Sequence, residues 1–119
     1  MNKISAYQDH AVSTQTRGRL IVLLYEGALK FLRQALGALE EGNFPEKGRY
    51  LSRAQAILSE LNANLNTEAG GEIAENLRSL YNFMSRQLNE ANTKRDPQRI
   101  RDVIVCLEDL LEGWRVVTS

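Results

Sequence analysis

The 119-residue sequence has few of the residues on which catalysis, metal binding and disulfide scaffolds depend. It contains one histidine, His10, and one cysteine, Cys106. A serine or cysteine triad needs a histidine base, and a di-metal site in a helix bundle needs histidines from two helices, so one histidine near the start of the chain argues against both. A single cysteine excludes an internal disulfide and fits a reducing compartment. We therefore expect no enzyme, no metal site and no cofactor.

The sequence also lacks an excess charge of either sign and a long apolar run. Its 15 basic and 15 acidic residues give zero formal net charge, which offers no electrostatic reason to expect nucleic acid or an anionic membrane as a partner. The longest apolar run, residues 20–25, is far too short to cross a bilayer. Residues 1–16 lack the apolar core of a signal peptide. We expect a cytoplasmic protein that does not insert into membranes.

The sequence has only two prolines, and these and three of its eight glycines fall where helices would begin and end. Pro45 and Pro97 each follow closely on a residue able to cap a helix, which predicts helix starts near both. Gly42 and the pair at residues 70–71 predict helix ends. Between these breaks apolar residues recur at spacings of three and four, and no useful stretch alternates with the period of two expected of a strand.

These breaks divide the chain into four helices, and their short connections force neighbouring helices to run antiparallel. We therefore predict an all-α fold: an antiparallel up-down-up-down four-helix bundle with a short N-terminal extension or helix. Thr14 and Thr16 offer caps for the first long helix, so we place the single bundle domain at residues 14–119. Residues 1–13, the leader, carry too few apolar groups to hold a helix together alone, and we expect a mobile or docking segment there.

The stretch at residues 20–39 is apolar around most of its circumference when it is drawn as a helix. One arc of roughly 100° faces the expected core and holds Leu20, Ile21, Leu24, Ala28, Phe31, Ala35 and Leu39. A second arc beside it holds Val22, Tyr25, Leu29 and Leu36. A bundle helix normally turns its outer face to water, so the second arc either packs on a neighbouring helix or, if it is exposed, forms an apolar patch that marks a partner site. An amphipathic partner helix fits such a groove.

Apolar residues outside the first helix extend this predicted site. The full set of candidate partner-binding residues is Ile4, Tyr7, Val22, Tyr25, Leu29, Leu36, Leu65, Phe83 and Val105. Ile4 and Tyr7 lie in the leader, which could cover the same groove while the partner is absent. From the residues alone, the sequence indicates a helical binding module with a leader that caps its own groove.

Several segments, in order along nearly the whole chain, resemble the flagellin-specific export chaperones of the FliS family. They include Tyr7, the sequence LYEGA at residues 24–28, GGEIA at residues 70–74, the pair at residues 80–81, and Trp114 at the end of the last helix. LYEGA and GGEIA are specific in combination, although either alone would be a weak signal.

The resemblance implies a cytoplasmic chaperone of the flagellar type III export pathway. Such chaperones bind the disordered C-terminal segment of new flagellin, which prevents premature polymerisation and keeps the subunit competent for export. Tyr7 matches the leader tyrosine that the family uses near the client groove. The client expected for this chain is therefore a flagellin C-terminal segment, and a component of the flagellar export gate is a further candidate partner.

Two alternatives come from other classes of protein. A scaffold or dimerisation module without a secretion role would pair its extra apolar face with a second copy of the chain, as a homodimer. A small RNA-binding module would use the basic residues between Lys94 and Arg101, but no aromatic residue interleaves them to stack on bases. A solvated helix start explains that basic cluster more simply.

Overall fold

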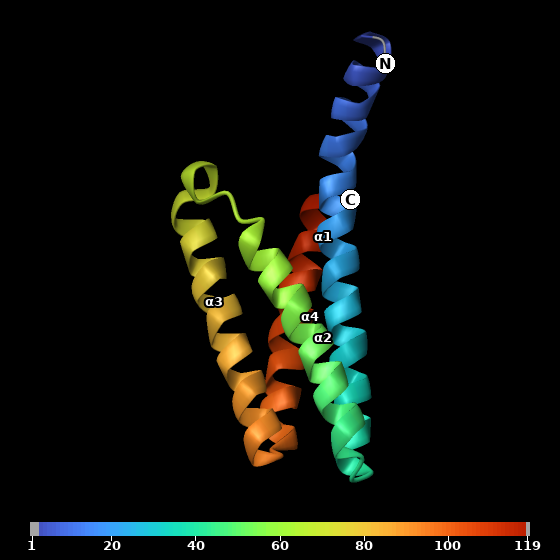
Figure 1. Ribbon diagram of the computed structural model, residues 1–119. Helices are drawn as coiled ribbons and strands as arrows, with labels where there is room; N and C mark the ends of the chain where they lie inside the picture. The colour runs from blue at the N-terminus through green and yellow to red at the C-terminus, as the bar shows by residue number, and fades with distance from the viewer. Residues whose placement is uncertain (1–2, 119) are drawn as a thin grey trace.

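The computed structural model of the protein is a bundle of four α-helices (Figure 1). The structure describes residues 3–118, with the side chains of residues 17–66 and 70–118. The helices are α1 (Lys3–Glu40), α2 (Phe44–Ala63), α3 (Thr67–Lys94) and α4 (Pro97–Thr118). Connections of a few residues join them, and successive helices run in opposite directions (Figure 1). The predicted all-α, up-down-up-down bundle is confirmed.

The predicted caps account for the ends of the helices. The Asn43 side chain accepts a hydrogen bond from the backbone N–H of Glu46 at 3.3 Å, and Pro45 stands in the first turn of α2. Gly42 has a φ of 78°, a left-handed conformation that glycine adopts without strain at a helix end. At the start of α4 the Asp96 carboxylate accepts from the backbone N–H of Gln98 at 3.1 Å.

Two helices begin differently from the sequence prediction. α1 is one helix from Lys3, so no new helix starts at Thr14 or Thr16. The sequence between Lys3 and Thr16 holds no proline or glycine, so nothing in it forces a break. α3 includes the predicted break at the glycine pair, because Gly71 has the non-helical angles φ 52° and ψ −127° and kinks the chain there.

The core runs along the axis of the bundle and receives side chains from all four helices. Its largest fully buried members include Leu32 of α1, Leu51 and Leu58 of α2, Met84 and Leu88 of α3, and Ile100 and Leu107 of α4. Each helix packs against its neighbours in chain order, and α4 closes the ring against α1. In the described part of the chain the backbones of α1 and α3 do not touch, so these two helices lie diagonally opposite.

Side-chain amide groups join α2 to α3 in addition to the apolar contacts between these helices. Gln55 donates to the Asn89 side chain at 2.7 Å and to the backbone carbonyl of Ser85 at 3.2 Å. Asn62 donates to the Asn82 side chain at 2.9 Å. Such bonds exchange readily with water when exposed, so they contribute less to stability than the same area of apolar packing would.

The lower end of the bundle is closed by the buried amine of Lys47. Its Nζ donates to the backbone carbonyl of Asn92 at 3.1 Å and to the Asn92 side chain at 2.5 Å. The ring of Phe44 lies between two cations, with Lys47 Nζ at 5.8 Å and Arg95 Cζ at 3.6 Å from its centroid. Burial lowers the pKa of Lys47, and the nearby charge of Arg95 lowers it further. These contacts fix the start of α2 to the end of α3.

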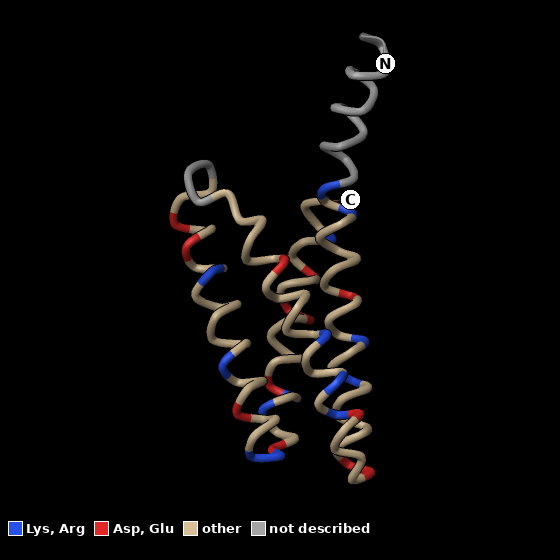
Figure 2. The backbone as a smooth tube through the Cα atoms, viewed as in Figure 1, with Lys and Arg blue, Asp and Glu red and all other residues tan. Residues whose placement is uncertain are grey.

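Charged residues of both signs are interspersed over all four helices (Figure 2). Arg33 pairs with Glu108 at 3.5 Å and Arg101 with Glu40 at 2.9 Å, both between α1 and α4. All four side chains are about half exposed, and such surface pairs contribute at most about 1 kcal/mol each. The apolar core therefore dominates the stability of the fold.

Replacing Leu32 by alanine tests the position of this core. Leu32 is fully buried, so its loss should lower the free energy of unfolding by about 2–5 kcal/mol through lost burial and a cavity. Leu23 lies on the same helix but is 61% exposed, and Leu23→Ala should change the stability by only about 0.5 kcal/mol. Urea denaturation followed by circular dichroism measures both. Equal effects at the two positions would contradict this placement of the core.

Candidate partner-binding surface

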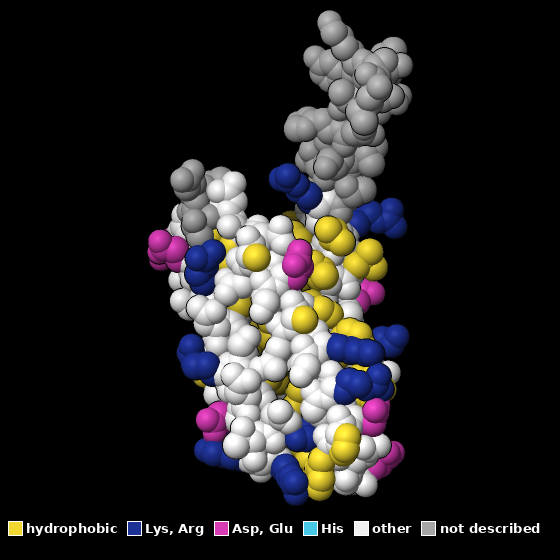
Figure 3. Space-filling view, in the orientation of Figure 1, with side chains coloured by type: hydrophobic (Ala, Val, Ile, Leu, Met, Phe, Trp, Pro, Cys, Tyr) yellow, Lys and Arg dark blue, Asp and Glu magenta, His cyan; other side chains and the backbone are white. Residues whose placement is uncertain are grey.

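Apolar side chains that the core does not bury gather at one end of the bundle, where the middle of α1 lies beside the C-terminal end of α4. Leu20 and Leu23 of α1 are 55% and 61% exposed, and Val116 and Val117 of α4 are 73% and 72% exposed. In Figure 3, hydrophobic side chains gather on the corresponding part of α1. Isolated exposed apolar residues are ordinary, but four at one end of the bundle, on two adjacent helices, form a surface that a partner could cover. We call these four residues the α1–α4 end patch.

A shallow depression continues the end patch along the seam between α1 and α4. It is lined by Arg19, Val22, Leu23, Glu26, Arg115 and Thr118. Gly18 lets the helices meet closely here, because a Cβ at this position would lie 2.7 Å from Cγ2 of Thr118. The depression combines an apolar floor with one arginine from each helix at its edges, so a partner segment there would meet both apolar and cationic groups.

A second apolar surface follows the seam between α3 and α4. Gln87 accepts a hydrogen bond from Arg99 at 2.9 Å, which identifies the side of α3 that faces α4. Residues at helical spacing from Gln87, toward the start of α3, lie on the same side. The half-buried and exposed apolar residues along this seam are Ile73, Leu77, Leu80 and Phe83 of α3 with Cys106, Leu110 and Trp114 of α4. We call this set the α3–α4 seam.

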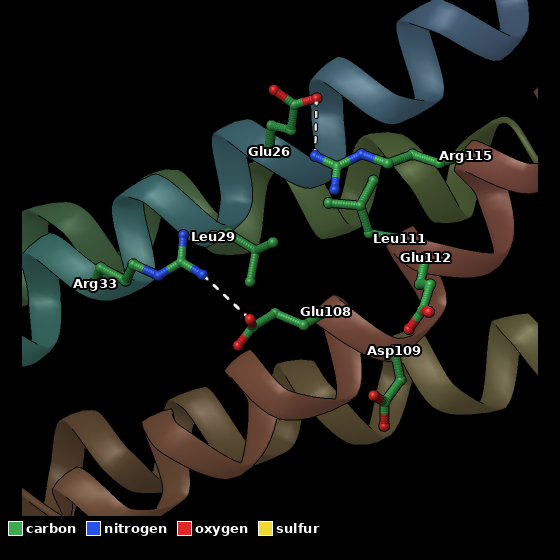
Figure 4. Close-up of a pocket in the computed structure, with 8 residues that line it drawn as sticks. All are labelled: Glu26, Leu29, Arg33, Glu108, Asp109, Leu111, Glu112 and Arg115. Atoms are coloured by element: carbon green, nitrogen blue, oxygen red, sulfur yellow. Dashed lines mark hydrogen bonds and ion pairs between the residues drawn. The ribbon is translucent and has the colours of Figure 1, made fainter. Parts of the chain in front are cut away.

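A third concave surface, between α1 and α4, is polar (Figure 4). Its floor is Leu29 and Leu111, which are only 3% and 4% exposed. Its walls carry the two ion pairs of Arg33 with Glu108 and Arg115 with Glu26, and the carboxylates of Asp109 and Glu112 lie at its rim (Figure 4). With little apolar surface to bury, this groove is a poor site for a hydrophobic partner segment.

The structure corrects the predicted exposure of Tyr25 and Leu29. Tyr25 is fully buried and Leu29 is 3% exposed, so both belong to the core and not to an outer arc. The reverse error affects Leu20, which was expected to face inward and is 55% exposed. The side of α1 that faces the core is centred near Leu32. The predicted inward arc was drawn from Leu20 and therefore pointed to one side of the core.

The other candidate residues are distributed over the surface. Val22 lines the depression, and Leu36 and Leu65 are half-buried against the core. Phe83 lies in the α3–α4 seam and is 48% exposed, whereas Val105 is 57% exposed on α4. The side chains of Ile4 and Tyr7 lie outside the described residues. The structure thus brings no single groove together from the predicted set. It also adds residues absent from that set, which are Leu20, Leu23, Ile73, Val116 and Val117.

Tyr25 is buried because its hydroxyl finds partners inside the bundle. Its oxygen lies 2.5 Å from the hydroxyl of Tyr81, and the two rings meet edge to face with centroids 6.4 Å apart. The ring of Trp114 also lies 6.4 Å from that of Tyr25. Burial raises the pKa of both tyrosines; hydrogen bonding to Tyr25 raises the pKa of Tyr81 further, and bonding to Tyr81 and Trp114 partly offsets the rise at Tyr25. A hydrogen bond thus joins α1 to α3 across the bundle axis.

The basic residues near the start of α4 are engaged within the protein. Lys94 pairs with Glu90 at 2.8 Å, Arg99 with Asp96 at 3.2 Å, Arg101 with Glu40 at 2.9 Å, and Arg95 lies on the ring of Phe44. A nucleic-acid site needs cations free to neutralise phosphates. These contacts favour the structural interpretation of the cluster over an RNA-binding one.

Chemical sites are not apparent elsewhere in the part of the chain that the structure describes. Among those residues, no three His, Cys, Asp or Glu side chains come together as metal ligands would. No helix built from them has the length and apolar character to cross a membrane. Burial, followed by the charge of Asp109, raises the pKa of the Cys106 thiol, which makes it a poor nucleophile.

Comparison with known proteins gives a consistent result. Residues 1–119 match the family described as "Flagellar protein FliS". The chain is 38% identical over 106 residues to "Flagellar secretion chaperone FliS" of Vibrio cholerae, covering 89% of this chain and 78% of the relative. It is 38% identical over 118 residues to "Flagellar secretion chaperone FliSB" of Pseudomonas aeruginosa, covering 96% and 94%. The corresponding protein of Salmonella typhimurium is 39% identical over 111 residues, covering 92% and 82%.

The buried tyrosine pair predicts how stability depends on alkaline pH. Because burial raises the pKa of Tyr81 in the folded state, its proton is held there after the unfolded chain has lost it. The stabilisation is complete below pH of about 10, the pKa of a free tyrosine, and is lost as pH rises above that value. The free energy of unfolding should fall by up to about 1.4 kcal/mol per pH unit for each such tyrosine.

Comparing the wild type with Tyr81→Phe isolates the contribution of Tyr81 to the alkaline pH dependence. The other groups with shifted pKa values, Lys47 and Cys106, are present in both proteins. The variant should lose less stability than the wild type between pH 10 and 11.5 in urea denaturation. An identical pH dependence in the two proteins would mean that Tyr81 is exposed in solution.

Proposed function

Because the chain belongs to the FliS family of flagellar proteins, we propose that it is an export chaperone whose client is the disordered C-terminal segment of flagellin. The client lies on apolar surface of the bundle and becomes ordered there. Covering that segment prevents flagellin from polymerising early in the cytoplasm and keeps it competent for flagellar type III export. The observation that carries the proposal is the apolar surface left over by the core, in the α1–α4 end patch and the α3–α4 seam.

The size and distribution of this surface favour a long client segment over a small ligand. Ordering a disordered chain costs about 1–2 kcal/mol of backbone entropy per residue, so a client must bury much apolar area to bind. Ile73 and Phe83 on α3 lie away from Leu23 and Val116 at the α1–α4 end patch, and all four are exposed. A segment that wraps over more than one seam can use both surfaces, whereas a compact ligand could use only one.

Val22 and Phe83 keep their place in this proposal as contacts at those surfaces, and Leu36, Leu65 and Val105 are candidate contacts for a client that extends beyond them. Tyr25 and Leu29 support the binding surface from within the core, because neither exposes enough side chain to contact a client. A charge at Tyr25 would be buried without a partner, so Tyr25→Asp should unfold the bundle instead of weakening binding selectively.

Aspartate substitutions on α3 test the proposed surface. Ile73 is 72% exposed and Phe83 48%, so Ile73→Asp and Phe83→Asp should leave the helical circular dichroism unchanged. Each should weaken binding of flagellin by roughly ten- to hundred-fold, since a buried apolar contact of that size contributes about 1.5–3 kcal/mol. Calorimetry with full-length flagellin measures the affinity. Ser79→Asp, at an exposed position on the side of the same helix turned away from the core, adds the same charge outside the α3–α4 seam and serves as the control.

The identity of the client segment is tested by truncating flagellin. Full-length flagellin should bind, and flagellin without its C-terminal segment should not. Unchanged binding of the truncated protein would overturn the proposal, as would equal losses in Ser79→Asp and Phe83→Asp.

The leader forms a second part of the proposal, supported by the resemblance of Tyr7 to the family's leader tyrosine. Ile4 and Tyr7 occupy apolar surface in the free protein and are displaced by the client. Removing a competing side chain should alter the affinity, so Tyr7→Ala should change the Kd for a flagellin C-terminal peptide by several-fold. An unchanged Kd in calorimetry would exclude a role for Tyr7 in controlling access.

A homodimerisation module remains the competing function, and the α1–α4 end patch is the surface it would use. Light scattering of the isolated protein separates the two. A tight dimer that flagellin does not dissociate, and that fails to bind flagellin, would favour the scaffold. An export-gate component as a further partner rests on the family resemblance alone.

A further inference from the structure

α3 is attached to the bundle unevenly along its length. At its C-terminal end, Asn92 binds the buried amine of Lys47, and Arg95 lies on Phe44 just beyond the helix. In its middle, the side chain of Asn89 and the backbone of Ser85 accept hydrogen bonds from α2. These contacts hold the lower half of the helix in place against its neighbours.

The first part of the regular helix is held differently. Residues 72–80, here called the upper arm of α3, begin directly after the Gly71 kink. Ile73 is 72% exposed, Leu77 and Leu80 are half-buried, and only Ala74 is buried. Within the described part of the chain, no hydrogen bond or ion pair joins the upper arm to another helix. A segment with few buried contacts, next to a backbone break, opens at low free-energy cost.

The tie nearest the upper arm is the hydroxyl pair of Tyr25 and Tyr81. Tyr81 follows the arm directly, and its hydroxyl lies 2.5 Å from that of Tyr25 on the diagonally opposite helix. The adjacent Asn82 bonds to Asn62 at 2.9 Å, but that bond is exposed to water. The tyrosine pair is buried, with exposures of 0% and 2%, so water cannot replace it while the bundle is closed.

We propose that the upper arm of α3 is a flap of the α3–α4 seam and that the Tyr25–Tyr81 hydroxyl pair is the latch that holds it closed. This regulation rests on the proposed function, since its ligand is the flagellin segment. When the latch opens, the arm moves away from α4, and Leu77, Leu80 and Leu110 present apolar surface that is half-buried in the closed form. The client segment occupies that surface and holds the flap open.

Tyr81→Phe and Tyr25→Phe test the latch in the isolated, full-length protein. Each removes one hydroxyl and keeps the ring. Hydrogen exchange followed by mass spectrometry should show amides of residues 74–83 exchanging about five-fold faster in both variants, because one net hydrogen bond shifts an equilibrium by about that factor. Peptides from residues 44–63 and 86–94 should exchange as in the wild type.

Tyr50→Phe is the matched control. It removes a hydroxyl from a half-buried tyrosine of α2 whose ring stacks on Phe31, in the seam opposite the proposed flap. The upper arm should exchange at the wild-type rate in this variant. Unchanged exchange of residues 74–83 in the latch variants would overturn the proposal. So would a uniform increase over all four helices, because that would make the pair a general contributor to core stability.

Titration with a synthetic peptide of the flagellin C-terminal segment tests the coupling to binding. If opening precedes binding, Tyr81→Phe should bind the peptide several-fold more tightly than the wild type, since the competent state is more populated. Equal affinities would overturn the coupling, even if the exchange data showed a latch. Absence of binding to the wild type would instead overturn the proposed function, and the exchange result would still decide whether the latch exists.

Discussion

The buried hydrogen bond between Tyr25 and Tyr81 joins α1 to α3, two helices whose backbones do not touch in the described part of the chain. α1 and α3 are diagonal neighbours, so only long side chains can join them. Two tyrosines are long enough, and each hydroxyl gives the other a partner away from water. The arrangement of the upper half of the bundle, including the position of Trp114 beside Tyr25, depends on this pair remaining buried.

The two ends of the bundle are stabilised by different physics, and this difference suits a chaperone. At the lower end, Lys47, Phe44 and Arg95 combine a buried amine with cation–aromatic contacts. At the upper end, apolar residues such as Ile73 and Val117 remain exposed. Under the proposed function, the protein takes up a disordered client and later releases it, which requires a stable frame together with apolar surface that its own core does not bury. The bundle provides both, with the stabilising contacts at its lower end and the exposed apolar surface at its upper end.

Much of the fold could be predicted because its signals are local. Asn43 with Pro45, Asp96 with Pro97, and Gly42 define helix ends through interactions within a few residues, and these predictions are confirmed. The family resemblance, carried by the LYEGA and GGEIA segments, is confirmed over the whole chain, and with it the expectation of a non-enzymatic protein.

The direction in which each side chain of α1 points was harder to predict. α1 is apolar on most sides, so hydrophobicity alone could not identify its inward face, and Tyr25 was assigned to the surface. A hydroxyl normally favours water, and its burial depends on Tyr81, 56 residues away, which no local pattern reveals.

Trp114 is the only tryptophan in the chain, and its ring lies 6.4 Å from that of Tyr25 at the end of the bundle where the apolar surface is exposed. Indole emission is sensitive to the polarity of its surroundings, and a tyrosine at this distance transfers its excitation to indole efficiently. The protein therefore carries an intrinsic optical reporter beside its proposed client-binding surface. Changes in the separation of α1 and α4 at that end would be visible in the emission of the unlabelled protein.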